Sequence, residues 1–313
     1  MIRNHSFVSM CLTTSSEIRM TKDPEKSAAA KLGFIGVGLM GSGMVNCLQM
    51  AGHETHLLIH KNRSPIEKAC KNGAISYDNI FDLADNVETL FLCLPSSEEV
   101  IEIARKLSTT PSKITFVIDC TTNSPDSVAT INKIFSNKNI EYLEAPLTGG
   151  VTQAAEGQLG AILGGTKDAV KKARPLLRSC CSKMSHVGPI GMGAKTKLVS
   201  NFLALGTATL VVEAFHIAKK IGIDWQSFYN LACQGSGHSM SLDRIAPKAI
   251  EGNYKGYVFS ISNTAKDFRY IHKLFLEEDP ELANLANWIL KQYESAEEKG
   301  LGSSLLSQRL DPQ

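Results

Sequence analysis

The sequence has few of the features that identify membrane, nucleic-acid-binding or zinc proteins. No apolar run approaches the roughly 18 residues that a membrane-spanning helix needs. The net charge is only +2 over 313 residues, so no basic excess favours a polyanionic partner. No Cys-x-x-Cys pair occurs, and no cysteine has a histidine at zinc-finger spacing. We therefore expect a protein that binds neither nucleic acid nor membrane and holds no metal.

The eight cysteines are scattered, and several lie inside apolar runs, as Cys93 does in TLFLCLP. A free cysteine packs as a small apolar side chain, and disulfides are rare in reducing compartments. We interpret the cysteines as buried free thiols of a cytoplasmic protein. Four histidines do not stand at metal-binding spacing with acidic residues: His186, His216, His238 and His272.

Residues 1–30 lack the long apolar core of a secretory signal, and they lack a clear amphipathic pattern. Their serines and arginines are typical of a mitochondrial transit peptide, whereas Glu17 argues against one. Met20 is an alternative start. We predict a disordered N-terminal tail and leave a mitochondrial location open.

What is present is the composition of a globular protein, with 43% apolar and 20% charged residues. From residue 31, short apolar runs alternate with stretches of helical periodicity, which predicts a parallel sheet covered by helices. The predicted strands are 31–38, 54–60, 89–95, 113–119, 140–147, 159–165 and 182–188, and the clearest helices between them are 41–52 and 64–73.

After about residue 193 the pattern becomes helical throughout. Residues 196–222 form a long helix that is apolar on all sides, which indicates burial between domains or subunits. The fold class is therefore α/β, a Rossmann-type doubly wound sheet in residues 31–193 followed by an all-α domain in residues 194–313. The apolar helix also predicts a homodimer or homotetramer. Further helices are predicted at 224–233, 241–252, 261–278 and 280–300.

The stretch GFIGVGLMGSGM carries Gly36-x-Gly38-x-x-Gly41 between a predicted strand and a predicted helix. That context is typical of a dinucleotide-binding loop. The first glycine permits the tight turn, the second lets the backbone approach a pyrophosphate, and the third lets helix and strand pack closely. Backbone N–H groups at the start of the helix then bind phosphate.

The second strand is followed by Lys61, Asn62 and Arg63, where an NAD-binding loop usually has an acidic residue for the ribose. Two cations suit a 2′-phosphate and leave a carboxylate without a role. We therefore favour NADP over NAD as the cofactor. A solvated basic turn without ligand is the alternative.

Two lysines stand in GMGAKTKLVSN. Lys197 and Asn201 are four residues apart and share one helix face, whereas Lys195 lies about 240° from Asn201 around the helix. A lysine whose pKa is lowered by burial or by a second cation can act as an acid or base near neutral pH. Gly191 and Gly193 would let the backbone approach the nicotinamide.

Four ordered segments resemble the β-hydroxyacid dehydrogenases, the 3-hydroxyisobutyrate dehydrogenase group related to 6-phosphogluconate dehydrogenase. GFIGVGLMGSGMVNCLQMAGH is similar to the N-terminal signature of that family. EAPLTGGVTQAAEGQL, from Glu144, is similar to its D-x-P-V-S-G-G-x-x-x-A-x-x-G loop, and GMGAKTKLVSN to its G-x-G-x-x-x-K-x-x-x-N. AKDFRY resembles its K-D-L segment, and DCTTNSP also matches. The resemblance covers about residues 32–300, with Glu144, Leu147 and Thr148 replacing the usual Asp, Val and Ser.

The resemblance implies hydride transfer between a nicotinamide cofactor and a small β-hydroxy acid or its semialdehyde. Lys197 would be the acid/base and Asn201 would orient it or bind the substrate hydroxyl. The substrate carboxylate would be held by Thr148, Gly149 and Gly150, with Lys266 adding a charge. The predicted cofactor-binding residues are Gly36, Val37, Gly38, Leu39, Met40, Gly41, Lys61, Asn62, Arg63, Leu94, Pro95, Thr122 and Lys266.

Three other readings stay open. An imine reductase or another carbonyl reductase is related, although that group generally replaces the lysine that is present here. A decarboxylating 6-phosphogluconate dehydrogenase carries a much longer helical region. A non-catalytic binding protein with a dehydrogenase-like domain typically loses the lysine. The sequence does not distinguish 3-hydroxyisobutyrate, glycerate or γ-hydroxybutyrate as the substrate.

Overall fold

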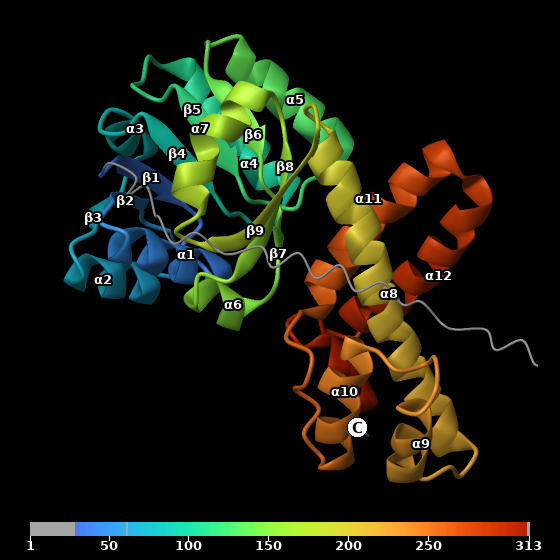
Figure 1. Cartoon of the computed structure of the whole chain (residues 1–313). Coiled ribbons are helices and arrows are strands. Elements are labelled where there is room, and N and C mark those ends of the chain that lie inside the picture. Colours follow the sequence, from blue (N-terminus) through green and yellow to red (C-terminus); the bar gives the residue numbers. More distant parts are fainter. Residues whose placement is uncertain (1–28, 61, 312–313) are drawn as a thin grey trace, which may run out of the picture.

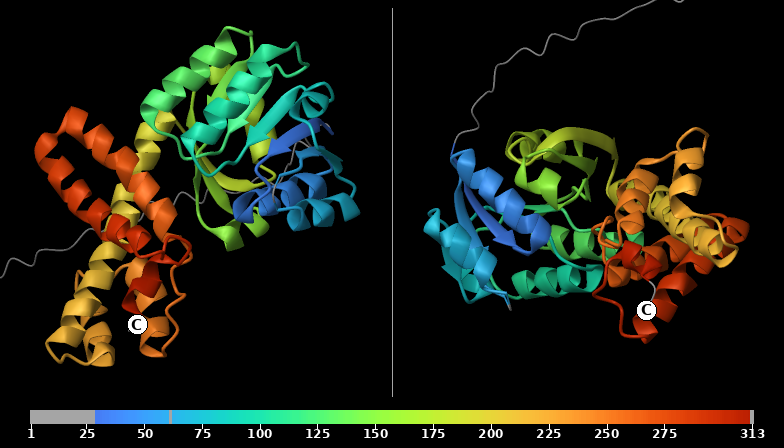
Figure 2. Two further views of the ribbon diagram at one scale, coloured as in Figure 1. Left: turned by 180° about the vertical axis from the view of Figure 1, so that it is seen from behind. Right: turned by 90° about the horizontal axis from the view of Figure 1, so that it is seen from below.

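The computed structural model describes residues 29–60 and 62–311. Nearly all of the predicted N-terminal tail therefore lies outside the described residues, and so does Lys61. Within the described part, a sheet domain is followed by a helical domain, and the two form separate lobes (Figures 1 and 2). The predicted fold class is confirmed.

The sheet has the order β3-β2-β1-β4-β5-β6-β8-β7, with β9 paired to β8. β1 to β6 pair in parallel, as predicted, but β8 runs antiparallel to β6 and β7, so the sheet is mixed. The strands are β1 (Lys31–Ile35), β2 (Glu54–Leu58), β3 (Ile75–Tyr77), β4 (Thr89–Leu92), β5 (Phe116–Asp119), β6 (Glu141–Glu144), β7 (Leu147–Thr148), β8 (Leu159–Gly164) and β9 (Cys181–Gly188).

Helices cover both faces of the sheet, because its central strands are apolar on both sides and bury nearly every residue. Two apolar clusters result, one on each face, and Phe34 and Leu90 belong to different ones. The helices of this domain are α1 (Leu39–Met50), α2 (Ser64–Lys71), α3 (Ile80–Ala84), α4 (Ser97–Thr109), α5 (Pro125–Ser136), α6 (Val151–Ala155) and α7 (Lys167–Leu177).

The helical domain is built around a third apolar cluster, to which Phe215, Phe268 and Tyr293 contribute. α11 and α12 form an antiparallel hairpin that packs beside α8 (Figure 1). The elements are α8 (Met192–Lys220), α9 (Trp225–Ala232), α10 (Met240–Ile250), α11 (Ile261–Glu278), α12 (Pro280–Glu298) and the 3₁₀ helix η1 (Leu306–Leu310).

The long helix α8 passes from one domain into the other (Figure 1). Ala194 in its first turn packs in a cluster of the sheet domain, and Leu198, one turn later, packs in the cluster of the helical domain. The helix starts at Met192, four residues before the predicted start. No separate linker joins the two cores; the backbone of α8 itself connects them.

The expectation that no segment is apolar enough to span a membrane is wrong for α8. Its 29 residues suffice by length and composition, because Gly, Ala and Thr between the large apolar residues keep it free of charge over many turns. Half of its most apolar segment is buried inside the protein, as expected of a core helix. The prediction that the protein binds no membrane stays a prediction.

Candidate active site

The glycine loop between β1 and α1 has the geometry that a dinucleotide requires. Gly36 has a φ of 101°, and a Cβ there would overlap the carbonyl oxygen of Cys93. A Cβ on Gly41 would overlap the carbonyl oxygen of Gly36. The helix therefore packs against the strand as closely as the third glycine of a dinucleotide-binding loop allows. A Cβ on Gly38, in contrast, would meet nothing within 4 Å. Gly38 therefore leaves open the space that the predicted pyrophosphate would occupy.

The N-terminus of α1 is open to an anion. No side chain caps it, and its first turn contains no acidic residue, so its partial positive charge is not compensated by the protein. Of the loop side chains, Val37 is buried, Met40 is half-buried and Leu39 is exposed. These residues therefore fit the phosphates and one apolar edge of a dinucleotide.

The basic turn that follows β2 is exposed. The side chains of Asn62 and Arg63 both reach solvent, and Arg63 Nη2 lies 3.4 Å from Asp78 Oδ1 in an exposed ion pair. An exposed pair of this length contributes little, so the Arg63 guanidinium remains available to a phosphate. The predicted contribution of Lys61 lies outside the described residues.

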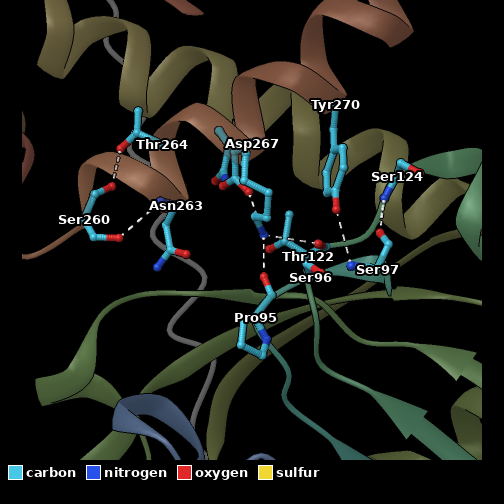
Figure 3. Close-up of polar contacts among 12 residues, drawn as sticks. Pro95, Ser96, Ser97, Thr122, Ser124, Ser260, Asn263, Thr264, Asp267 and Tyr270 are labelled. Atoms are coloured by element: carbon cyan, nitrogen blue, oxygen red, sulfur yellow. Dashed lines mark hydrogen bonds and ion pairs between the residues drawn. The ribbon is translucent and has the colours of Figure 1, made fainter. Parts of the chain in front are cut away.

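Lys266 joins the two domains at the edge of the sheet, where Pro95 and Thr122 lie opposite Asp267 of α11 (Figure 3). It lies on α11, and its Nζ donates to the carbonyl oxygen of Pro95 at 2.9 Å and to that of Thr122 at 3.5 Å. Pro95 and Thr122 follow the neighbouring parallel strands β4 and β5, whose carboxyl ends form the usual ligand-binding edge of a doubly wound sheet. One turn further on, the hydroxyl of Tyr270 accepts the N–H of Ser97 at 3.3 Å.

Asp119, the last residue of β5, shapes the loop that carries Thr122. Its carboxylate is fully buried and accepts the N–H of Thr121 at 2.9 Å, the Asn123 amide at 2.8 Å and the Tyr142 hydroxyl at 2.8 Å. Burial raises the pKa of this carboxyl group, and the hydrogen bonds act in the opposite direction. The Thr121 hydroxyl in turn accepts the N–H of Leu94 at 3.0 Å, which ties the two loops together.

Lys197 and Asn201 lie one turn apart on α8, and a buried carboxylate on α11 links Asn201 to Lys266. Asn201 Nδ2 donates to Asp267 Oδ2 at 2.6 Å, while Lys266 Nζ lies 3.0 Å from Asp267 Oδ1. Asp267 is 1% exposed, and its Oδ1 receives no hydrogen bond of good geometry from the described residues. The role of Asp267 was not predicted, although the K-D pair of the sequence contains it.

Burial lowers the pKa of Lys197 to about 8, and the nearby Lys266 charge acts in the same direction while Asp267 opposes it. A lysine with this pKa can take up or release a proton near neutral pH. Lys195 differs sharply, because its ammonium forms an exposed ion pair with Glu278 at 3.2 Å. The two lysines of the motif thus have separate environments, as their spacing predicted.

Thr148 is the last residue of β7, and Gly149 and Gly150 lead from it into α6, which packs against α1. Gly149 has a φ of 108°. The N–H of Gly150 donates to Gln153 Oε1 at 2.9 Å, so this amide is already used within the loop. That bond counts against its predicted role in holding a carboxylate. Among the described residues, no hydrogen bond or ion pair joins this loop to Lys197 or Lys266.

Gly191 and Gly193 have a different role from the predicted approach to a nicotinamide. The N–H of Gly191 donates to Glu144 Oε2 at 2.6 Å, and that of Ala194 donates to Glu144 Oε1 at 2.7 Å. A Cβ on Gly193 would lie 2.9 Å from Glu144 Cβ. The Gly-x-Gly motif therefore admits a buried carboxylate from β6 to the start of α8.

Two features lie away from these residues, in the helical domain. Cys233, His238 and Asp243 have ligand-type atoms within 4.8 Å of one another, so the expectation that His238 stands apart from acids is wrong. The bend between α9 and α10 brings them together. A cavity of about 360 Å³ is lined by residues that include His216, Lys299 and Arg309. None of these was a predicted site residue. The described cysteines are free thiols, as predicted, but Cys70, Cys93 and Cys233 are only half-buried.

Two sequence profiles of known protein domains match the chain. A sequence profile described as the NAD binding domain of 6-phosphogluconate dehydrogenase matches residues 31–188. A second, described as the NAD-binding of NADP-dependent 3-hydroxyisobutyrate dehydrogenase, matches residues 191–308. The mitochondrial 3-hydroxyisobutyrate dehydrogenase of Drosophila melanogaster is 27% identical over 285 residues, which are 89% of this chain and 87% of that protein.

Two further proteins are similar. A probable mitochondrial 3-hydroxyisobutyrate dehydrogenase of Arabidopsis thaliana is 30% identical over 242 residues, or 72% of this chain and 68% of the relative. The structure of Mycobacterium tuberculosis 3-hydroxyisobutyrate dehydrogenase with L-serine shares the fold, with a TM-score of 0.78 and 22% identity over 90% of this chain and 98% of that one. The chain therefore belongs to the 3-hydroxyisobutyrate dehydrogenase-like family of NAD(P)-dependent oxidoreductases, within the 6-phosphogluconate dehydrogenase superfamily.

Proposed function

We propose that the protein interconverts a small β-hydroxy acid and its semialdehyde, with Lys197 as the acid/base. The observation that carries this proposal is the environment of Lys197, which is half-buried, has a pKa of about 8 and lies next to the Lys266–Asp267 pair. Strongly lowered lysine pKa values are typical of functional sites, whereas a lysine on the surface keeps a pKa near its ordinary value. The same observation counts against a non-catalytic binding protein.

The bound dinucleotide supplies the hydride acceptor or donor. In the oxidation direction, neutral Lys197 Nζ takes the hydroxyl proton of the substrate; in the reduction direction, the ammonium returns it. Asn201 is held by its 2.6 Å bond to Asp267, so its amide oxygen faces away from that carboxylate and is free to orient the substrate hydroxyl or the lysine. Lys266 keeps the loops after β4 and β5 in place and lowers the pKa of Lys197.

The substrate class is proposed from the relatives, several of which are named 3-hydroxyisobutyrate dehydrogenases. Thr148 and the Gly149 amide are the groups of the β7–α6 loop that we assign to the substrate carboxylate. For the cofactor we propose a preference for NADP, because the turn after β2 carries Arg63 and Lys61 and has no acidic residue. A cytoplasmic location is also proposed, on the basis of the free thiols.

We further propose that the protein is a homodimer or homotetramer that associates through α8. Met192, Val199, Leu203, Leu210 and Ile217 are between 39% and 72% exposed. At 100° per residue these five side chains fall within about 40° of one another around the helix. We call this set the α8 stripe. A continuous apolar stripe of this length on a soluble domain is typical of a subunit interface.

The test is a panel of small hydroxy acids and semialdehydes with NADP(H) and NAD(H), read as absorbance at 340 nm. We expect turnover of at least one pair, and we expect Lys197→Ala to lower kcat by about 10²–10⁴-fold. Lys195→Ala is the matched control, since Lys195 lies on the same helix in an exposed ion pair. Equal loss in both variants, or full activity in Lys197→Ala, would refute the assignment.

A further inference from the structure

The start of α8 is capped by a residue of the sheet that lies far away in the sequence. Gly191 is the N-cap and has no side chain to accept the first N–H groups of the helix. Glu144, at the end of β6, caps the helix instead. Its Oε2 accepts the N–H of Gly191 at 2.6 Å, and its Oε1 accepts the N–H of Ala194 at 2.7 Å. The two capping bonds span 47 and 50 residues of sequence. An N-cap usually comes from the helix itself, so this contact joins two parts of the fold.

The packing around Glu144 leaves no room for it to move. The residue is 2% exposed. β8 lies on its other side, where a Cβ on Gly164 would overlap Glu144 Oε2 and would lie 2.6 Å from the Gly193 N atom. Two glycines, Gly164 and Gly193, thus hold open the space through which the carboxylate reaches the helix. Burial raises the pKa of Glu144 to about 7, while the N–H groups that both of its oxygens accept favour the ionised form.

The cap lies next to the proposed acid/base. Lys197 follows Ala194 by three residues, less than one helical turn after the capped N–H. Ala194 belongs to the sheet domain and Leu198 to the helical domain, so Lys197 lies at the point where α8 leaves one core for the other. The side chain that fixes α8 against the sheet at this point is Glu144.

We propose that Glu144 is a positioning residue for Lys197: by capping α8 from β6, it fixes the lysine relative to the cofactor-binding edge of the sheet. The inference rests on the proposed function of Lys197. Glu144 does not contact the reacting atoms; it acts through the first turn of the helix. A catalytic group that is displaced by about 1 Å can lose on the order of 10²-fold in rate, so a small loosening of this turn is enough to matter.

The test replaces Glu144 by glutamine, which has the same shape but turns one acceptor into a donor that faces an N–H group. We expect Glu144→Gln to lower kcat by about 10–100-fold, to leave the dissociation constant of the cofactor within about 2-fold, and to keep the pH at which the rate changes. A variant that only displaces Lys197 lowers the maximal rate of the pH profile but leaves its midpoint pH unchanged. Removal of the acid/base itself abolishes that midpoint.

The matched control is Glu213→Gln. Glu213 is a carboxylate on α8 itself; it lies about five turns beyond the capped N–H of Ala194 and pairs with Arg309 and His216. We expect this variant to lose stability and to keep kcat within about 2-fold, because it leaves the first turn of the helix intact. A wild-type kcat in Glu144→Gln, or losses of kcat that simply follow the losses of Tm in both variants, would overturn the inference.

Hydrogen exchange tests the same contact without any substrate. We expect residues 191–198 to exchange at least about 10-fold faster in Glu144→Gln than in the wild type, and to be unchanged in Glu213→Gln. Unchanged exchange refutes the positioning role even if the enzyme proves active. If Glu144→Gln exchanges faster but the wild type turns over no substrate of the panel, the proposed function is refuted and the cap is established.

If Glu144→Gln does not fold, Glu144→Asp is the second variant, because it keeps the charge on a side chain one methylene shorter. We expect it to lower kcat by about 3–10-fold, and an unchanged kcat would again overturn the proposal.

Discussion

The sheet domain contributes mainly backbone groups to the centre of the candidate site, whereas the helical domain contributes side chains. From the sheet come the open glycine loop, the free N–H groups of α1, and the carbonyl oxygens of Pro95 and Thr122. From the helices come two lysines, an amide and a buried carboxylate: Lys197, Lys266, Asn201 and Asp267. The division follows from local structure, since loops at strand ends expose the backbone, whereas helices satisfy their own backbone and present side chains.

The two domains also differ in how completely they cover their own apolar surface. Among the described residues, four large apolar side chains are exposed before residue 190 and fourteen after it. The sheet is covered by helices on both faces and forms a closed unit. The helical domain leaves the α8 stripe uncovered. We therefore expect the sheet domain to supply most of the cofactor-binding groups, with Lys266 of α11 added at its edge, while catalysis and association depend on the helices.

The strongest test of this division changes the lysine alone. Lys197→Met should lower kcat by about 10²–10⁴-fold and leave the affinity for the cofactor unchanged. It should also raise the free energy of unfolding at pH 7 by roughly 1–3 kcal/mol, because the folded protein no longer holds a cation whose pKa burial has lowered. Steady-state kinetics and urea denaturation measure the two effects. Loss of stability would show that Lys197 serves the fold.

The difference in exposed apolar surface between the two domains can be tested by placing charged side chains in the α8 stripe. The double variant Leu203→Asp/Leu210→Asp places two carboxylates in the proposed interface and should raise the dissociation constant of the oligomer by roughly 100-fold or more. Met50→Asp is the control, because Met50 is 80% exposed at the end of α1 in the sheet domain. Light scattering after size-exclusion chromatography gives the mass of each. A wild-type protein that is already monomeric would remove the proposed interface.

The pH dependence should follow the helical side chains. With the pKa of Lys197 at about 8, kcat/KM for oxidation needs the neutral amine and should rise about tenfold per unit of pH up to about 8 before levelling. For reduction the ammonium is needed, so the rate should fall above that pH. Asp267 raises the pKa of Lys197, and Asp267→Asn should move both profiles to lower pH. Profiles that do not move would assign the titration to another group.

The smallest expected effect lies in the sheet domain. Arg63→Ser should weaken the binding of NADPH by about 5–10-fold and leave that of NADH within about 2-fold, because only the former carries a 2′-phosphate. The exposed ion pair with Asp78 contributes little to the fold, so stability should not change. Fluorescence titration with both cofactors measures the ratio. Equal weakening of both would remove the argument for NADP.

Much of the sheet domain could be predicted because its signals are local. The spacing of Gly36, Gly38 and Gly41 identifies the glycine loop from six consecutive residues. Lys197 and Asn201 could be placed on one face because a helix fixes that geometry. Short or exposed elements such as β3 (Ile75–Tyr77) and α6 (Val151–Ala155) could not, because so few residues show no clear period.

The contacts that complete the site could not be predicted because they join distant segments. The bond from Asn201 to Asp267 spans 66 residues, and those from α8 to Glu144 span about 50. Nothing in the local pattern says that the motif around Gly191 meets a strand rather than a cofactor. The exposure of the α8 stripe could not be predicted either. Its apolar residues look like those of the buried face in the sequence, and only the packing of the other helices distinguishes the two faces.

The passage of α8 through both cores has a consequence for recombining this protein with its relatives. A chimera is usually cut in a flexible linker, but here the chain enters the second core within four residues of leaving the first. A crossover placed near residue 190 would pair a foreign helix start with the native Glu144 and Gly164. Crossovers before β6 or after the first three turns of α8 keep these partners from one parent, and they are the cuts that we expect to yield folded hybrids.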